Sequence, residues 1–297
     1  MPASVSGGSG EVDFAPETLF KQFSNEGAIY FSDDYEALDN LKINIGGRYT
    51  AFQHAGHIAF TDFIKNEFTQ DKVNQYGNFE PRLSARYKLN LSSSLKASYS
   101  KNYQYIHLAS IGGMSMPTDL WLPSSEKLKP TDGSQYTLGY FKNLRNNKYE
   151  TSVEAYYKEM KNLIEYKEGA LPEDNANGRQ DDALTLGDGN SYGLELFVKK
   201  VTGKTTGWIG YTHSYTNRIF PEINNGEWFP AKYDRRHDLS LVLNQVLSKH
   251  WNVSAVFVYA TGSALTIPTE RYIINGNIYT EYSGKNEYRM DSYHRAD

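Results

Sequence analysis

Apolar and polar residues alternate along most of the chain from Asn25 onward. In Leu41–Ala51 the odd-numbered positions are Leu, Ile, Ile, Gly, Tyr and Ala, whereas Lys42, Asn44 and Arg48 lie on the other face. A period of two residues is typical of a β-strand with one apolar face. The same alternation recurs in Phe79–Lys88, Leu95–Leu108, Tyr149–Tyr157 and Trp251–Tyr259. Long helical patterns are absent, so the sequence predicts an all-β fold of about ten strands.

The connections between the predicted strands alternate between short and long. Short ones, rich in Asn, Asp, Gly or Ser, are expected near Leu38–Asn40, Asn90–Ser94, Leu144–Lys148, Thr202–Thr205 and Ser248–His250. Long ones are expected between them, near Ala55–Gly77, Ser110–Ser134, Lys167–Gly189, Asn217–Arg236 and Gly262–Ser292. A compact soluble domain rarely has five such loops, because most connections are about 4–6 residues long. Transmembrane β-barrels combine short periplasmic turns with long external loops. The sequence therefore predicts an antiparallel up-and-down transmembrane β-barrel.

The composition agrees with a barrel. The mean hydropathy is −0.63, yet the chain contains 24 Tyr, 14 Phe and 4 Trp. In a membrane barrel only the lipid-facing half of each strand must be apolar. Clusters of tyrosines, such as Tyr99, Tyr103 and Tyr105 or Tyr156 and Tyr157, suit the aromatic girdles at the membrane interfaces. The alternative is that tyrosine simply favours strands.

Charge and cysteine content exclude several classes of protein. The net charge of −4 gives no reason to expect a nucleic-acid partner. Without cysteine the chain has neither a disulfide framework nor a thiolate metal site. No run approaches the roughly 18 apolar residues of a membrane helix. The first 24 residues, which include MPASVSGGSGEVDF, lack the features of a secretory signal and are expected to be a linker or tag. Residues 25–297 are expected to form the barrel, and the natural start is expected to lie upstream.

Six stretches together carry a family resemblance: FEPRLSARYKLN (79–90), LKASYSKNYQYIHLAS (95–110), PTDLWLPSSEKLKP (117–130), GNSYGLELFVKK (189–200), NNGEWFPAKYDRRHDLS (224–240) and YRMDSYHRAD (288–297). They resemble the barrel of TonB-dependent outer-membrane receptors of the Bacteroidetes type, which carry a carboxypeptidase-regulatory-like domain. The resemblance covers about Asn25 to Asp297. It implies a barrel of about 22 strands around a plug domain. This chain would be the C-terminal part of that barrel, truncated at both ends.

The resemblance also implies a function in the cell outer membrane. The intact parent would import a scarce nutrient by TonB-coupled transport, without making or breaking a bond and without a cofactor. The implied partners are outer-membrane lipid, the plug domain, TonB, a surface lipoprotein, and a small-molecule, glycan or peptide substrate. Two other classes stay open: a small self-closed barrel acting as an adhesin or passive pore, and a soluble β-propeller or lectin.

Two sets of residues are candidates for the transport role. Four charged residues at polar positions of the strands are expected to face the lumen: Arg48, Arg82, Arg86 and Glu154. Large side chains in two of the long loops are expected to contact the ligand: Met116 and Trp121, beside Met114 and Leu120, and Trp228, Phe229 and Tyr233. The alternative for the second set is that these side chains pack loop against loop.

Three further motifs are weighed as chemical sites. The run Asp234–Asp238 (DRRHD) is expected to form ion pairs at the barrel rim, because adjacent strand residues point to opposite faces and cannot easily share a metal ion. The acidic stretch Glu173–Asp182 lacks the order of an EF-hand loop and is interpreted as a mobile acidic loop. The glycine-rich Gly187–Gly193 is interpreted as a flexible loop end. No Ser–His–Asp arrangement stands out, and no catalytic or metal-binding residue is predicted.

Overall fold

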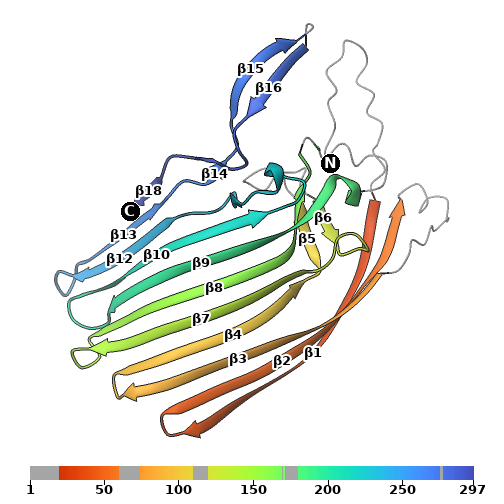
Figure 1. Cartoon of the computed structure of the whole chain (residues 1–297). Helices are drawn as coiled ribbons and strands as arrows, with labels where there is room; N and C mark the ends of the chain where they lie inside the picture. Colours follow the sequence, from red (N-terminus) through yellow and green to blue (C-terminus); the bar gives the residue numbers. More distant parts are fainter. Residues whose placement is uncertain (1–19, 60–73, 110–119, 169, 171–179, 275–276) are drawn as a thin grey trace.

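The computed structural model describes residues 20–59, 74–109, 120–168, 170, 180–274 and 277–297. These residues form an all-β fold without an α-helix, in which a 12-stranded antiparallel sheet is accompanied by three two-stranded sheets. The predicted fold class is confirmed. Figure 1 shows that the large sheet is curved.

The strands of the large sheet follow one another in sequence order. They are β1 (Phe20–Leu38), β2 (Leu41–Ala59), β3 (Asn74–Asn90), β4 (Ser93–Gln104), β7 (Thr131–Leu144), β8 (Tyr149–Tyr166), β9 (Leu184–Lys200), β10 (Thr205–Ile219), β12 (His237–Val246), β13 (Asn252–Ala260) and β18 (Tyr293–Ala296), and β11 (Phe229–Pro230) pairs with β10. The small sheets pair β5 (Ile106–Ala109) with β6 (Leu120–Pro123), β14 (Ala264–Leu265) with β17 (Tyr288–Arg289), and β15 (Pro268–Ile274) with β16 (Asn277–Tyr282). Two short 3-10 helices span Gln180–Ala183 and Asn224–Gly226.

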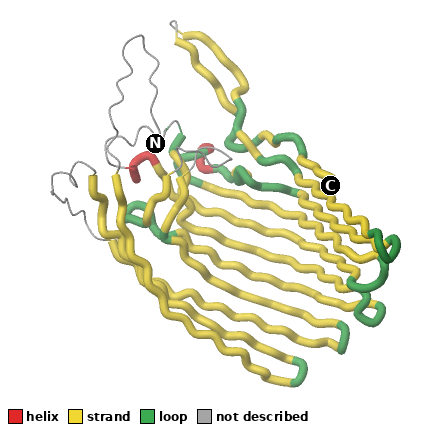
Figure 2. Tube along the Cα trace, turned by 180° about the vertical axis from the view of Figure 1, so that it is seen from behind, coloured by secondary structure: helices red, strands yellow, loops and turns green. Residues whose placement is uncertain are grey.

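Short and long connections lie at opposite ends of the sheet (Figures 1 and 2). All five predicted short turns are present, between β1 and β2, β3 and β4, β7 and β8, β9 and β10, and β12 and β13. Asn146 and Asn147 have φ values of 54° and 61°, and Gly203 has 109°, which are left-handed conformations that asparagine and glycine tolerate best. The alternation of short and long connections is therefore confirmed. We call the two ends of the sheet the turn end and the loop end.

Three segments differ from the sequence-based expectations. The strand predicted at Leu95–Leu108 breaks at Tyr105, because β4 ends at Gln104 and the chain then turns onto the sheet as β5. Gly187–Gly193 is not a flexible loop end but lies within β9. A Cβ atom at Gly187 would overlap the ring of Phe220, so the glycine there allows a connection to pack closely on the strand. The first strand begins at Phe20, within the segment 1–24.

The two faces of the large sheet differ in chemistry, as the alternation predicts. Adjacent strands align Asn44, Ser84, Ser98 and Thr137 in one row on what we call the polar face. The other side, the apolar face, carries Leu138, Leu194 and Ile209. Leu138 is 59% and Leu194 is 41% exposed, so the apolar face is not turned into a dry protein interior. A large exposed apolar surface of this kind marks contact with lipid or another partner.

The compact core of the chain lies at the loop end. One buried cluster comprises Ala109, Leu122, Leu128, Tyr166 and Leu184, and another comprises Phe220, Ile223 and Phe229. Both fasten long connections to the ends of β8 and β9. The loop end is thus held by apolar packing, whereas the middle of the sheet has solvent on one side and an exposed apolar surface on the other.

The large sheet is open in the described residues. Its order runs from β1 to β18, and these two edge strands do not pair with each other. Open edges present unpaired backbone groups, which need a partner strand inside a membrane. The structure therefore does not support the alternative of a small self-closed barrel, and a single continuous sheet also contradicts the β-propeller alternative.

Candidate functional site

The connection between β4 and β7 folds onto the polar face at the loop end. The Tyr76 hydroxyl donates a hydrogen bond to the backbone oxygen of Ser125 at 2.6 Å, and Asn78 Nδ2 donates to the Tyr105 hydroxyl oxygen at 3.0 Å. The rings of Phe52 and Tyr105 stack with centroids 5.0 Å apart. Figure 1 shows β5 and β6 inside the curve of the sheet. This connection therefore narrows the space that the sheet surrounds.

His107 anchors the same connection from within. Its ring is buried, with Nε2 2.9 Å from the Ser124 Oγ and Nδ1 3.3 Å from the Thr131 Oγ1. Burial lowers the pKa of His107 to about 4, because desolvation disfavours the charged ring. The pair resembles the Ser–His part of a catalytic triad, but a hydroxyl stands where a triad has a carboxylate, and the buried Ser124 cannot reach a substrate. The contact is structural.

The hairpin of β5 and β6 has one buried and one exposed face. His107, Ala109 and Leu122 are buried. On the opposite face Trp121, which is 66% exposed, lies directly across from Leu108 and near Ile106, and both aliphatic side chains are also exposed. A large ring beside two aliphatic side chains offers a flat surface on which a planar group or a sugar ring can stack.

A buried carboxylate fastens the connection between β10 and β12 to β8. The Glu165 carboxylate forms ion pairs with Arg218, whose Nη1 lies 3.1 Å away, and with Lys232, whose Nζ lies 3.4 Å away. Arg218 also donates to the Tyr233 hydroxyl oxygen at 2.5 Å. Burial lowers the pKa of Lys232, and the neighbouring Glu165 carboxylate opposes that shift. The largely buried ion pairs between these three charged groups therefore hold the connection between β10 and β12 against β8.

The second buried carboxylate belongs to the run Asp234–Asp238. Asp234 forms ion pairs with Arg236, at 2.8 Å, and with Arg289 from β17, and it accepts a hydrogen bond from the Thr216 amide at 2.6 Å. His237 faces the other way, toward the Tyr211 hydroxyl at 2.7 Å. The described residues contain no group of three side chains that could hold a metal ion. The expected ion-pair role is confirmed for Asp234 and Arg236.

The predicted ligand contacts have different environments. Trp228 and Tyr233 are exposed in the connection between β10 and β12. Phe229 is only 2% exposed and packs on Phe220 with ring centroids 6.0 Å apart, so for this residue loop packing replaces the predicted ligand contact. Met116, with Met114, lies outside the described residues. Most of Glu173–Asp182 does so as well, although Asp181 accepts a hydrogen bond from Ser125 and Asp182 pairs with Lys127.

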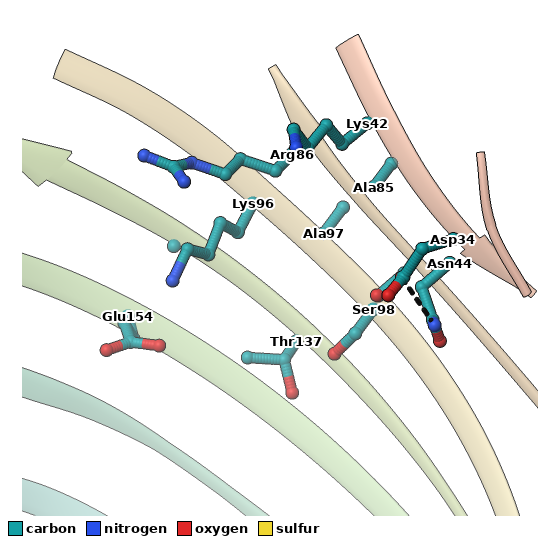
Figure 3. Close-up of a pocket in the computed structure, with 12 residues that line it drawn as sticks. Asp34, Lys42, Asn44, Ala85, Arg86, Lys96, Ala97, Ser98, Thr137 and Glu154 are labelled. Carbon is teal, nitrogen blue, oxygen red and sulfur yellow. Dashed lines mark hydrogen bonds between the residues drawn. The ribbon is translucent and has the colours of Figure 1, made fainter. Parts of the chain in front are cut away.

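The four charged residues expected to face a lumen share the polar face. Arg48 lies 3.4 Å from the Glu26 carboxylate and 3.7 Å from the Glu80 carboxylate, whereas Arg82 donates to Asn102 Oδ1 at 3.2 Å. Arg86 and Glu154 line a hollow of 340 Å³ in the same face (Figure 3). Whether this face surrounds a lumen stays a prediction.

A row of tyrosines crosses the apolar face about midway along β4, β8 and β9. Adjacent strands align Tyr99, Tyr136, Tyr157, Tyr192 and Tyr215. Of the other tyrosines expected in a girdle, Tyr103 lies on the same face of β4 as Tyr99, whereas Tyr105 is buried and Tyr156 lies on the polar face. From the row toward the turn end, the apolar face of β7 to β10 carries no Asp, Glu, Lys or Arg until Lys142 on β7 and Lys200 on β9, near the turns: the residues of this uncharged band are Leu138, Tyr140, Thr151, Val153, Ala155, Leu194, Leu196, Val198, Ile209, Tyr211 and His213.

The height of this uncharged band matches a membrane. From Tyr192 to Lys200, β9 rises about 26 Å along the strand, because each residue adds about 3.3 Å. At the tilt of about 35–45° found in barrels, that length spans about 20 Å, close to the apolar band of about 25 Å in outer-membrane barrels. No helix in the described ranges is long and apolar enough to cross a membrane.

Comparison with known proteins agrees with this geometry. The sequence model of one family, described as TonB dependent receptor-like, beta-barrel, matches residues 3–297. The chain belongs to this family. Members of the TonB-dependent receptor family are outer-membrane β-barrel proteins that act as transport receptors. No functionally curated protein matches the chain.

Solved receptor structures share the fold of this TonB-dependent receptor barrel. The ferripyoverdine receptor of Pseudomonas aeruginosa matches with a TM-score of 0.61 and 16% identity over 93% of this chain and 32% of its own. The FrpB iron transporter of Neisseria meningitidis has a TM-score of 0.59, 12% identity, and coverage of 94% and 38%. The ferric yersiniabactin uptake receptor FyuA of Yersinia pestis has a TM-score of 0.58, 14% identity, and coverage of 94% and 38%. The chain thus spans about a third of each of these receptors.

Some residues of the candidate site escaped the sequence analysis. Ile106 and Leu108 complete the exposed face around Trp121, but their stretch reads as the continuation of a strand. The partner of Asp234 on β17, Arg289, is 55 residues away in the sequence. No local pattern signals either arrangement, because both depend on how a long connection folds back onto this receptor-like barrel.

Proposed function

We propose that this chain forms part of the wall of a TonB-dependent outer-membrane receptor that imports a scarce nutrient. The observation that carries the proposal is the exposed, uncharged apolar band below the tyrosine row, in a chain of the TonB-dependent receptor family. Lipid is the environment that stabilises such a band. The polar face would then line the interior of the barrel, with Arg48, Arg82, Arg86 and Glu154 among its charges.

The proposal includes partners outside this chain. A plug domain would fill the barrel and contact TonB, and a surface lipoprotein would assist capture. We further propose that the parent is of the Bacteroidetes type with a carboxypeptidase-regulatory-like domain, on the six stretches that carry the resemblance. Residues 25–297 would form the barrel wall, together with the start of β1 from Phe20.

The long connections would capture the substrate at the loop end. Five exposed residues would contact the substrate: Trp121, Ile106 and Leu108 on the hairpin of β5 and β6, and Trp228 and Tyr233 on the connection between β10 and β12. Their surfaces favour a ligand with a flat face, as in a chelate, a glycan or a peptide with aromatic groups. The matched receptors handle ferripyoverdine, iron and ferric yersiniabactin. Transport would occur without a chemical step or a cofactor, so the parent would not be an enzyme.

Cysteine labelling on whole cells tests the topology. These 297 residues contain no cysteine, so each single substitution adds one thiol to this part of the receptor, and the unsubstituted parent receptor gives the background labelling. Glu227→Cys lies in a long connection and Lys204→Cys lies in the short turn between β9 and β10, and both positions are exposed. In cells that produce the parent receptor, a membrane-impermeant maleimide should label the first and spare the second. Labelling of the turn, or protection of the connection, would contradict the proposed orientation.

A matched pair of tryptophans tests substrate capture. Trp121 lies at the loop end, whereas Trp251 is similarly exposed next to a short turn at the other end. Trp121→Ala should weaken substrate binding and uptake by the parent receptor by at least about tenfold, as expected for an aromatic anchor. Trp251→Ala should leave both unchanged. Equal effects of the two substitutions would assign them to folding and remove the hairpin from the binding site.

A further inference from the structure

Three cations lie where the uncharged band of the apolar face ends, near the turn end of the sheet. Lys142 on β7 and Lys200 on β9 share the face of the band, because they pair with Thr151 and Tyr149 of the intervening strand β8. Arg145, in the turn between β7 and β8, places its guanidinium carbon 5.9 Å from the centre of the Tyr149 ring. We call Lys142, Arg145 and Lys200 the cationic edge.

The cationic edge has no countercharge within the described residues. None of its three side chains forms an ion pair there. Residues 142–151 and 198–206, which form this corner of the sheet, contain six Lys and Arg but one acidic residue, Glu150. Glu150 lies on the polar face, where it pairs with Lys199 at 3.4 Å. The positive charge on the apolar side is therefore available to a partner outside these residues.

The same face has balanced charge on the other side of the band. Beyond the tyrosine row, toward the loop end, Lys101 follows Tyr99 on β4 and forms an ion pair with Asp132 of β7 at 3.2 Å. Glu159 follows Tyr157 on β8. On the apolar face of β7 to β9, the excess of positive charge thus lies at the turn end.

We propose that the cationic edge binds the headgroup of an anionic phospholipid, in the membrane leaflet at the turn end. The phosphate lies between the ammonium groups of Lys142 and Lys200. The acyl chains lie along the uncharged band, where Val153 and Val198 are 44% and 42% exposed. The inference rests on the proposed function, because it requires the band to lie in lipid, and it adds a preference for negative headgroups on one side of the membrane.

The spacing of the two lysines suits a single headgroup. Lys142 and Lys200 are separated by β8 and by two residues along the strands. Strand spacings of about 4.8 Å and a rise of about 3.3 Å per residue place their Cα atoms about 12 Å apart. Flexible four-carbon stems can bring both ammonium groups to one phosphate. Lysines at a membrane edge lay their stems on apolar surface and keep the charge at the interface, where a lipid-facing cation costs little.

Native mass spectrometry of the parent receptor tests the site. Phosphatidylglycerol and phosphatidylcholine with the same acyl chains are the probes, and each is titrated into the receptor in detergent. We expect tighter binding of phosphatidylglycerol, because the choline group of the other lipid offsets its phosphate. K142Q/R145Q/K200Q should weaken the binding of phosphatidylglycerol by at least about fivefold, which is the effect of roughly one Lys or Arg near anionic lipid. Binding of phosphatidylcholine should stay unchanged.

Two further variants separate a headgroup site from general effects of charge and packing. K88Q/K96Q/K249Q also removes three positive charges, two from the polar face and one from the turn between β12 and β13, and should bind phosphatidylglycerol as the unsubstituted receptor does. K142R/R145K/K200R keeps the charge of the cationic edge and should retain the binding.

Three results would overturn the proposal. Equal binding of the two lipids would remove the preference for negative headgroups. Equal weakening in the two Gln variants would assign the effect to overall charge, and a loss in K142R/R145K/K200R as large as in K142Q/R145Q/K200Q would assign it to packing. Displacement of the bound lipid by excess inorganic phosphate would assign the cations to free anions.

Vesicles of pure phosphatidylcholine separate this inference from the proposed function. They offer an apolar interior without net charge, so the parent receptor should insert into them whether or not the cationic edge binds a headgroup. Failure to insert would contradict the proposed function. Insertion without a preference for phosphatidylglycerol would overturn the inference alone.

Discussion

Replacing Asp234 with Ala is expected to open the loop end between β10, β12 and β17. The carboxylate has an exposure of 0% and joins three elements: it accepts the Thr216 amide at 2.6 Å and forms ion pairs with Arg236 and Arg289. Without it, two guanidinium groups and one amide lose their acceptor. A buried group left without its partner costs more than the intact pair contributes, because its desolvation is no longer compensated.

The size of the effect follows from burial. Breaking a fully buried ion pair by removing one partner costs about 3–5 kcal/mol. The side chains of Arg236 and Arg289 are 28% and 26% exposed, so water reaches them once the carboxylate is gone. We therefore expect a loss near the lower end, about 3 kcal/mol. Arg289 also donates to the backbone oxygen of Asp234 at 2.6 Å, and Asp234→Ala leaves that bond available.

Hydrogen exchange and denaturant unfolding of the purified chain in detergent measure this prediction. Asp234→Ala should accelerate hydrogen exchange of the Thr216 amide. It should also lower the free energy of unfolding, or of local opening, by about 3 kcal/mol. Glu150→Gln is the matched control, because it removes a carboxylate from an ion pair with Lys199 in which both side chains are 44% exposed. An exposed pair of this kind contributes less than about 1 kcal/mol. Equal effects of the two substitutions would refute the argument from burial.

Three further predictions follow from packing, burial and the apolar face. The folded chain keeps His107 neutral down to a pKa of about 4, whereas the unfolded chain takes up a proton near 6.5. The free energy of unfolding therefore decreases as the pH falls between these values, by up to about 3 kcal/mol. When it is measured over a pH series, this decrease should be smaller in His107→Asn and unchanged in His250→Asn. Gly187→Val should cost about 1–3 kcal/mol in denaturant unfolding because its side chain has no space, and an unchanged midpoint would contradict the packing at the loop end. In lipid vesicles Leu194→Lys should destabilise the parent barrel by about 2–4 kcal/mol, whereas Thr212→Lys on the polar face should have little effect; equal costs would contradict the assignment of the two faces.

Much of the sheet could be predicted from the sequence because it is built from neighbours in the chain. Each strand of the large sheet pairs with the next strand in sequence order, apart from the small excursions into β5–β6, β11 and β14–β17. The turn at Leu38–Asn40 needs only residues that tolerate a sharp reversal. The alternation in Leu41–Ala51 needs only two different environments on the two sides of the strand.

The candidate site was less predictable, because exposure in a long connection depends on distant residues. Trp121 and Phe229 are both large aromatics in predicted loops, yet one is exposed and the other is buried on Phe220. The sequence identified Asp234 as an ion-pair residue, but its partner Arg289 is reached only when β14 and β17 fold back. Local patterns carry no information on such contacts.

The sequence by itself determined that the strands have one apolar and one polar side, where most of them turn, and that turns and long connections alternate. These features can be predicted from the sequence because a strand's alternation and a turn's conformation each depend on residues only a few positions apart in the chain. The tertiary structure alone decided the cross-strand register. That register aligns five tyrosines at one height of the apolar face and sets like charges side by side on the polar face, Arg86 beside Lys96 and Glu154 beside Glu195. Register couples residues on different strands through backbone pairing, and a shift by one residue would move every side chain to the opposite face.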